Sequence, residues 1–150
     1  MSTKTKSPRR WHADPQAAAK LFAKLQPFTA AEHTALTLPV RLSWQSIITG
    51  AGTEGDWHNL ACCANICLIR SESIHQTCVD ACNQVCDGLE TMRARAQRTG
   101  RWAACHQTLQ AIPALLDMYE QIMQLSTPLQ MHTAMQTVLA RMQAQRQAQN

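Results

Sequence analysis

An apolar stripe between Ile74 and Ala96 constrains the fold of this 150-residue chain more than any other feature. Its members recur three or four residues apart: Ile74, Cys78, Ala81, Cys82, Val85, Leu89, Met92 and Ala96. This spacing places them on one face of an α-helix of about six turns. Gly100 predicts the end of that helix, because glycine adopts the left-handed conformation that closes helices. The stripe therefore predicts a long helix packed along one side.

Helical signals also cover the rest of the sequence, and no segment shows the alternation typical of a strand. Capping boxes predict three helix starts, at Thr29 with Glu32, Thr53 with Asp56 and Thr127 with Gln130. Other predicted helices begin at Pro15 and near His106. Pro39 predicts a break, so we expect separate helices from about 30 to 37 and from 40 to 48. Pro113 predicts either a kink or a late first turn in the helix at roughly 106–125, in which Leu109 should face inward.

The segment from Trp57 to Ile69 is apolar on nearly its whole circumference. A helix of that kind is typically buried on all sides. We therefore predict an all-α fold with one domain at residues 14–146, a bundle of about five to seven helices with a buried central helix. Residues 1–13 are predicted to be a basic, disordered N-terminal tail, and the end of the chain after about residue 143 should fray.

The net charge of +4 belongs to the N-terminus. Lys4, Lys6, Arg9 and Arg10 supply four positive charges, and the other 140 residues contain ten basic and ten acidic side chains. No apolar run approaches the length of about 18 residues that a membrane span requires, and no secretory signal is visible. We expect a cytoplasmic protein with no membrane partner.

Six of the seven cysteines lie between Cys62 and Cys86. Disulfides are disfavoured by the odd count and the helical spacing. A zinc site could be drawn from His58, Cys62, His75, Cys82 and Cys86, although no C-x2-C pair occurs. Because Cys78 and Cys82 fall inside the apolar stripe, the favoured interpretation is reduced cysteines that pack as small apolar side chains. We therefore expect no metal and no cofactor.

Catalytic motifs are missing from the sequence: it has no G-x-S-x-G, no H-E-x-x-H and no phosphate-binding glycine loop. We expect that the protein is not an enzyme and has no catalytic residues.

A run of cations at the end of the stripe helix is the strongest candidate binding site. It comprises Arg93, Arg95, Arg98 and Arg101, followed by Trp102. Compensation of the helix dipole would explain part of this run. Arginine and tryptophan also dominate protein-binding hot spots, so the run could instead contact an acidic partner. Together with the basic tail, it could alternatively serve a nucleic-acid-binding regulator.

The stretches LSWQSIITGAGTEGDWHNLACCANI and LSTPLQMHTAM resemble small helical proteins carried by proteobacterial prophages and plasmids. The resemblance spans about residues 38–135 and transfers no functional residue. It implies an accessory protein of a mobile genetic element that binds a host protein or ribonucleoprotein complex, as anti-CRISPR proteins do. Direct nucleic-acid contact is not favoured. For the methionine-rich last helix, with Met131, Met135 and Met142, ordinary core packing is the favoured interpretation, and packing against a second copy would instead give a homodimer.

Overall fold

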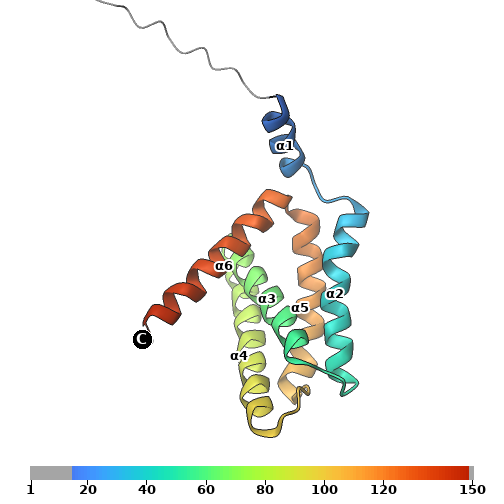
Figure 1. The fold of residues 1–150 in the computed structure, drawn as a ribbon, viewed down its shortest axis with the longest axis vertical. Helices are drawn as coiled ribbons and strands as arrows, with labels where there is room; N and C mark the ends of the chain where they lie inside the picture. The colour runs from blue at the N-terminus through green and yellow to red at the C-terminus, as the bar shows by residue number, and fades with distance from the viewer. Residues whose placement is uncertain (1–14, 149–150) are drawn as a thin grey trace, which may run out of the picture.

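The computed structural model describes residues 15–148, which fold into helices packed together, with no strand in that range (Figure 1). The helices are α1 Pro15–Leu25, α2 Ala30–Ile48, α3 Glu54–Ser71, α4 Gln76–Thr99, α5 His106–Leu125 and α6 Pro128–Ala148. The predicted all-α bundle is confirmed. The predicted tail at residues 1–13 lies outside the described residues. None of the helices within 15–148 has the length and apolar character needed to cross a membrane.

Helix α3 is the centre of the bundle, as the sequence predicted. It contacts α2, α4, α5 and α6, and its buried residues lie on more than one face: Trp57, Leu60, Cys63, Ala64, Ile66, Cys67 and Ser71. The capping box at Thr53 and Asp56 starts the helix, with the Thr53 backbone N–H donating to the Asp56 carboxylate at 2.9 Å. This pairing satisfies amide groups that a helix start would otherwise leave without partners.

Helix α4 packs its predicted stripe against α3 and α5. Cys82, Val85, Leu89, Met92 and Ala96 are all buried. The prediction for Ile74 was wrong, because α4 begins two residues later, at Gln76, and Ile74 lies exposed in the preceding turn. The helix closes at Gly100, whose φ is 70°.

Neither internal proline divides its helix, which corrects the predicted break at Pro39. Helix α2 is continuous from Ala30 to Ile48, and Pro113 lies well inside α5. A proline removes one hydrogen bond to the carbonyl four residues earlier. Pro39 and Ala35 are both exposed, as are Pro113 and Leu109. Water can therefore solvate each free carbonyl. The exposure of Leu109 also contradicts its predicted inward orientation, and Thr108 is buried in its place.

The first and last helices extend away from the central bundle (Figure 1). Helix α1 packs against α6, and its Leu21 and Leu25 remain exposed. Helix α6 starts with the predicted Thr127–Gln130 capping box and continues to Ala148. Fraying from residue 143 is therefore not seen in the described part of the tail, where Ala, Gln and Arg are good helix formers.

Candidate functional site

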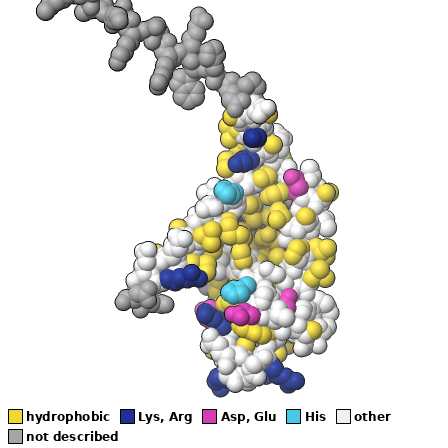
Figure 2. Space-filling model, in the orientation of Figure 1, with side chains coloured by type: hydrophobic (Ala, Val, Ile, Leu, Met, Phe, Trp, Pro, Cys, Tyr) yellow, Lys and Arg dark blue, Asp and Glu magenta, His cyan; other side chains and the backbone are white. Residues whose placement is uncertain are grey.

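The C-terminal end of α4 carries an exposed cationic surface formed by Arg95, Arg98 and Arg101, called here the arginine surface. Met92 and Ala96 are buried on the opposite side of the helix and hold it against the core. Figure 2 shows dark-blue side chains at the lower end of the molecule, where Figure 1 shows the end of α4. The arginine surface is thus a cationic patch on a firmly packed helix end.

The three arginines of this surface have no anionic partner among residues 15–148. Salt bridges in that range instead involve Arg41, Arg93 and Arg141, together with His58. No carboxylate therefore neutralises the arginine surface within the folded part of the chain.

Arg93 and Trp102, which the sequence grouped with these arginines, lie in a packed aromatic cluster. The Arg93 guanidinium lies 5.3 Å from the centre of the Trp57 ring, and its Nη1 is 3.7 Å from a Glu90 carboxylate oxygen. Trp57 also contacts Trp102, with ring centres 5.8 Å apart, and donates a hydrogen bond to the Leu89 carbonyl at 2.8 Å. Trp102 is only partly exposed. Both residues thus contribute to packing beside the arginine surface.

The α4–α5 loop is fixed by a close approach to the α2–α3 loop. A Cβ atom at Gly52 would lie only 2.5 Å from the backbone carbonyl oxygen of Trp102 and 2.8 Å from Cγ1 of Ile47. Only glycine fits at this position without a shift of backbone. The contact joins two loops far apart in the sequence and positions the end of α4.

The cysteines pack mainly as small apolar side chains, and all seven are free of disulfides. Cys63, Cys67 and Cys82 are buried, whereas the other four are partly exposed. Burial raises the pKa of the Cys82 and Cys86 thiols to about 11. These thiols are therefore protonated and poorly nucleophilic at neutral pH.

The residues of the zinc hypothesis are divided among three places, and Cys82 is buried in the core beside Ser71 and Met118. His58, Cys62 and Cys86 border a groove between α3, α4 and α6. His75 instead caps the start of α4, where its Nδ1 accepts from the Thr77 backbone N–H at 3.2 Å. Cys86 follows eleven residues later, about 16 Å along the helix. Within residues 15–148 no group of three or more His, Cys, Asp or Glu side chains is placed to hold a metal ion.

Cys105 lies in a different environment from the thiols of Cys82 and Cys86, and it was not among the residues predicted from the sequence to form a site. It is the N-cap residue of α5, where its backbone N–H donates to the Thr108 hydroxyl at 2.9 Å. Partial burial works to raise the pKa of the Cys105 thiol. Hydrogen bonds from the Thr108 hydroxyl and from backbone N–H groups outweigh that effect, so the pKa is lowered. The sequence signal was the Cys105-x-x-Thr108 spacing before a helix.

We predict that Cys105 reacts before Cys82 and Cys86 when the native protein is treated with a limiting amount of iodoacetamide near pH 7. The lowered pKa of Cys105 increases its thiolate fraction, whereas a raised pKa keeps Cys82 and Cys86 protonated. Peptide mass spectrometry after short exposure would measure the order of labelling, and urea-unfolded protein provides the control, in which the difference should disappear. Faster labelling of Cys86 than of Cys105 in native protein would contradict the described environments.

Comparison with known proteins leaves the geometry as the basis for assigning function. No protein-family model matches the chain, and no curated protein or solved structure gives a significant match. The function of the protein is therefore inferred from the arginine surface and the contacts that support it.

Proposed function

We propose that this protein is a non-enzymatic binding module that engages an acidic surface of a protein or ribonucleoprotein target through Arg95, Arg98 and Arg101. The observation that carries the proposal is the absence of any carboxylate partner for these three exposed side chains within residues 15–148. A guanidinium offers five donors in a planar array that pairs well with carboxylates and phosphates. An acidic partner would supply the missing acceptors.

The stability of the folded helix does not require three such arginines at one helix end. A cation in the last turn contributes about 0.3–1 kcal/mol through the helix dipole, and salt screens this effect. Arg98 lies in the last turn of α4, but Arg95 lies earlier and Arg101 follows the Gly100 cap. The cluster therefore exceeds what the helix terminus needs, which favours a role in recognition.

Rigid support makes the same residues suitable for tight binding. Side chains on an immobile scaffold lose less conformational freedom on association than those on a mobile loop. Here Met92 and Ala96 are buried beneath the arginines, and the loop after Gly100 is held by the approach of Trp102 to Gly52. This support places the arginine surface in a defined geometry before a partner arrives.

The resemblance to accessory proteins of proteobacterial prophages and plasmids suggests the kind of target. Such proteins commonly act by binding host components, so we propose a host defence ribonucleoprotein complex as the partner and inhibition as the outcome. An anti-CRISPR-like role of this type needs a complementary surface and no catalytic residue. An acidic patch on a protein subunit would satisfy the arginine surface directly.

The combined substitution Arg95→Ala, Arg98→Ala and Arg101→Ala should abolish target capture while leaving folding almost unchanged. Exposed side chains away from special backbone features usually alter the free energy of unfolding by less than about 0.5 kcal/mol each. Capture should be measured by pull-down of the tagged protein from a proteobacterial lysate with mass spectrometry of bound species, and stability by thermal unfolding. Retained capture with an unchanged melting temperature would remove the arginine surface from consideration.

Two further variants sharpen this experiment. Lysine at the same three positions keeps the charge but loses the planar donor array, so it should restore binding only partly. Alanine at Lys4, Lys6, Arg9 and Arg10 removes four charges from the N-terminus and serves as the matched control. That variant should capture the target as the natural sequence does.

A second candidate function, nucleic-acid binding, is favoured by the charge distribution along the chain. Residues 1–25 contain six basic side chains and one acid, for a net charge of +5, whereas residues 26–150 contain eight basic and nine acidic ones, for a net charge of −1. A segment of this kind can neutralise phosphates, and such binding weakens steeply as salt rises. Under this alternative, which uses the basic tail together with the arginine run, the N-terminal control variant would lose binding as well as the triple arginine variant.

A further inference from the structure

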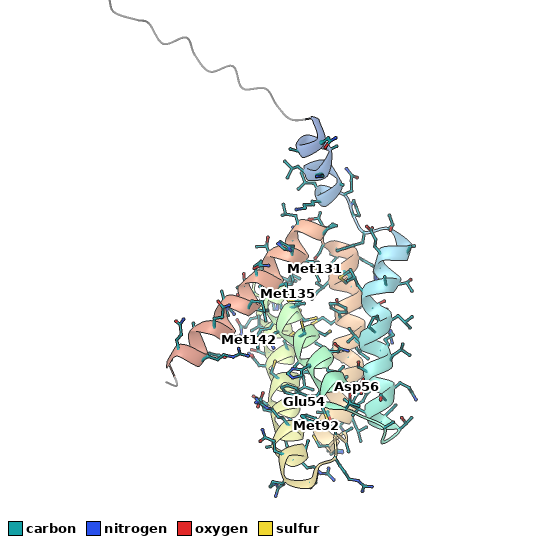
Figure 3. All side chains as sticks on the ribbon, in the orientation of Figure 1. Glu54, Asp56, Met92, Met131, Met135 and Met142 are labelled. Carbon is teal, nitrogen blue, oxygen red and sulfur yellow. The ribbon has the colours of Figure 1, made fainter. Side chains whose placement is uncertain are left out.

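Helix α1 lies outside the core of the bundle. The core reaches the first turn of α6, where Figure 3 labels Met131, and Phe28 packs against it just before α2 begins. Beyond this level α1 projects from the bundle, where it contacts α6 (Figure 1). Every side chain that the structure describes in α1 is exposed. The helix therefore offers these side chains to a partner.

Two adjoining rows of side chains run along α1. Leu21 and Leu25 are four residues apart and form an apolar row, with 53% and 48% of their surface exposed. Lys20 and Lys24 form a cationic row beside it, since residues three or four apart are neighbours on a helix. Figure 2 shows dark-blue and yellow side chains together on this helix. A lysine can also lie along an apolar surface while its ammonium group stays in water.

The cations of α1 are not neutralised within the described part of the chain. The helix contains no acidic residue, and neither of its lysines forms a salt bridge among residues 15–148. Residues 1–14 add four basic side chains and one acid. The sequence up to Leu25 thus combines a net charge of +5 with two exposed leucines.

An anionic membrane surface is the partner that uses both rows of α1. Basic amphipathic helices lie in the plane of the bilayer interface, with apolar side chains toward the acyl chains and cations at anionic headgroups. Nucleic-acid phosphates would engage the lysines but leave the leucines in water. A helix of 11 residues is also marginally stable in water without packing along its apolar side. A lipid surface supplies this packing without needing a groove of matching shape.

We propose that α1 is an interfacial helix that binds an anionic phospholipid surface, with Leu21 and Leu25 toward the acyl chains and Lys20 and Lys24 at the headgroups. The helix lies parallel to the membrane, and the bundle stays in water. The proposal revises the expectation that the protein has no membrane partner. That expectation concerned spanning segments and secretory signals, neither of which an interfacial helix needs. The arginine surface takes no part in this contact.

The test is co-sedimentation of the full chain with vesicles of phosphatidylcholine that contain about 30% phosphatidylglycerol. Partitioning at low salt should be at least about 10-fold stronger than onto phosphatidylcholine alone. Leu21→Gln with Leu25→Gln keeps every charge but should weaken partitioning about 10-fold, because the apolar row is lost. Lys20→Gln with Lys24→Gln should weaken it by a similar factor, and only onto the anionic vesicles. Both variants should melt like the natural protein, since the changed side chains are exposed.

Leu38→Gln with Leu42→Gln is the matched control, because it removes two leucines of α2 that are also four residues apart and are 48% and 58% exposed. It should partition like the natural protein, and so should the triple arginine variant. The proposal would be overturned if the natural protein did not bind the anionic vesicles, or if the Leu21 and Leu25 variant bound them normally. Loss of binding in the triple arginine variant would also overturn it, by assigning the contact to the arginine surface. The vesicle measurement needs no host target, so its outcome is independent of the capture experiment.

Discussion

Cys82→Asp should lower the free energy of unfolding by about 3–5 kcal/mol, because it places an uncompensated charge in the core. The Cys82 side chain has no exposed area, and its sulfur lies 3.7 Å from the Met118 sulfur and 3.8 Å from the Ser71 hydroxyl. Neither neighbour can neutralise a carboxylate. Cys82→Ala removes only the sulfur and should cost about 1–2 kcal/mol, by leaving a small cavity.

Thermal and urea unfolding of three variants would measure this difference. Asn83→Asp is the control, since it introduces the same charge at the next, exposed residue of α4 and should be nearly neutral. The penalty of Cys82→Asp relative to the natural sequence should also shrink as the pH falls from 7 toward 5. The buried carboxyl has a raised pKa, so protonation stabilises the folded state more than the unfolded one. Similar melting temperatures for Cys82→Asp and Asn83→Asp would show that Cys82 is not buried.

Gly52→Ala should destabilise the protein by about 3 kcal/mol, an effect at the upper end of the usual range for overpacking. The added Cβ would lie 2.5 Å from the Trp102 carbonyl oxygen and 2.8 Å from Cγ1 of Ile47. Ile47 is almost fully buried, so it cannot move aside. Relief therefore requires the α4–α5 loop to shift, which would also disturb the contact between Trp102 and Trp57. Chemical unfolding would give the energy, and tryptophan fluorescence would report the shift.

Gly55→Ala provides the comparison for this variant. A Cβ there has its nearest neighbour at 3.6 Å, and the residue lies in the first turn of α3. Alanine has a higher helix propensity than glycine, so this change should be neutral or slightly stabilising. If Gly52→Ala were as stable as Gly55→Ala, the two loops could not be in the contact described here.

The helix ends and the principal buried stripe were predictable from the sequence, since they depend on residues close together in the chain. Thr53 and Asp56 satisfy amides within one turn, and Gly100 supplies the left-handed residue that closes α4. The stripe from Cys82 to Ala96 was equally clear, because a helix with one apolar side must bury it. Helix α3 is apolar on nearly its whole circumference, and this pattern predicted its central position in the bundle for the same reason.

Other features depended on which side of a helix meets water, and only the tertiary structure decided them. Pro39 was expected to end a helix, but it faces solvent, where its missing hydrogen bond costs little. Thr108 rather than Leu109 entered the core, because its hydroxyl is satisfied by the Cys105 backbone at 2.9 Å. Both outcomes depend on the rotation of a helix about its axis, which packing against other helices fixes.

The candidate site also combines features that the sequence determined with features that only the tertiary structure decided. The sequence by itself determined that a cationic run follows the stripe and ends near Gly100, since the charges and the spacing of these residues do not depend on tertiary contacts. The tertiary structure decided which members are available to a partner. Trp102 is partly buried against Trp57, a residue more than thirty positions away, and the exposed Arg93 is held over the same ring and paired with Glu90, while Arg95, Arg98 and Arg101 are exposed without such contacts. Contacts between residues so far apart arise only when α3 and α4 pack side by side, so no local pattern could reveal them.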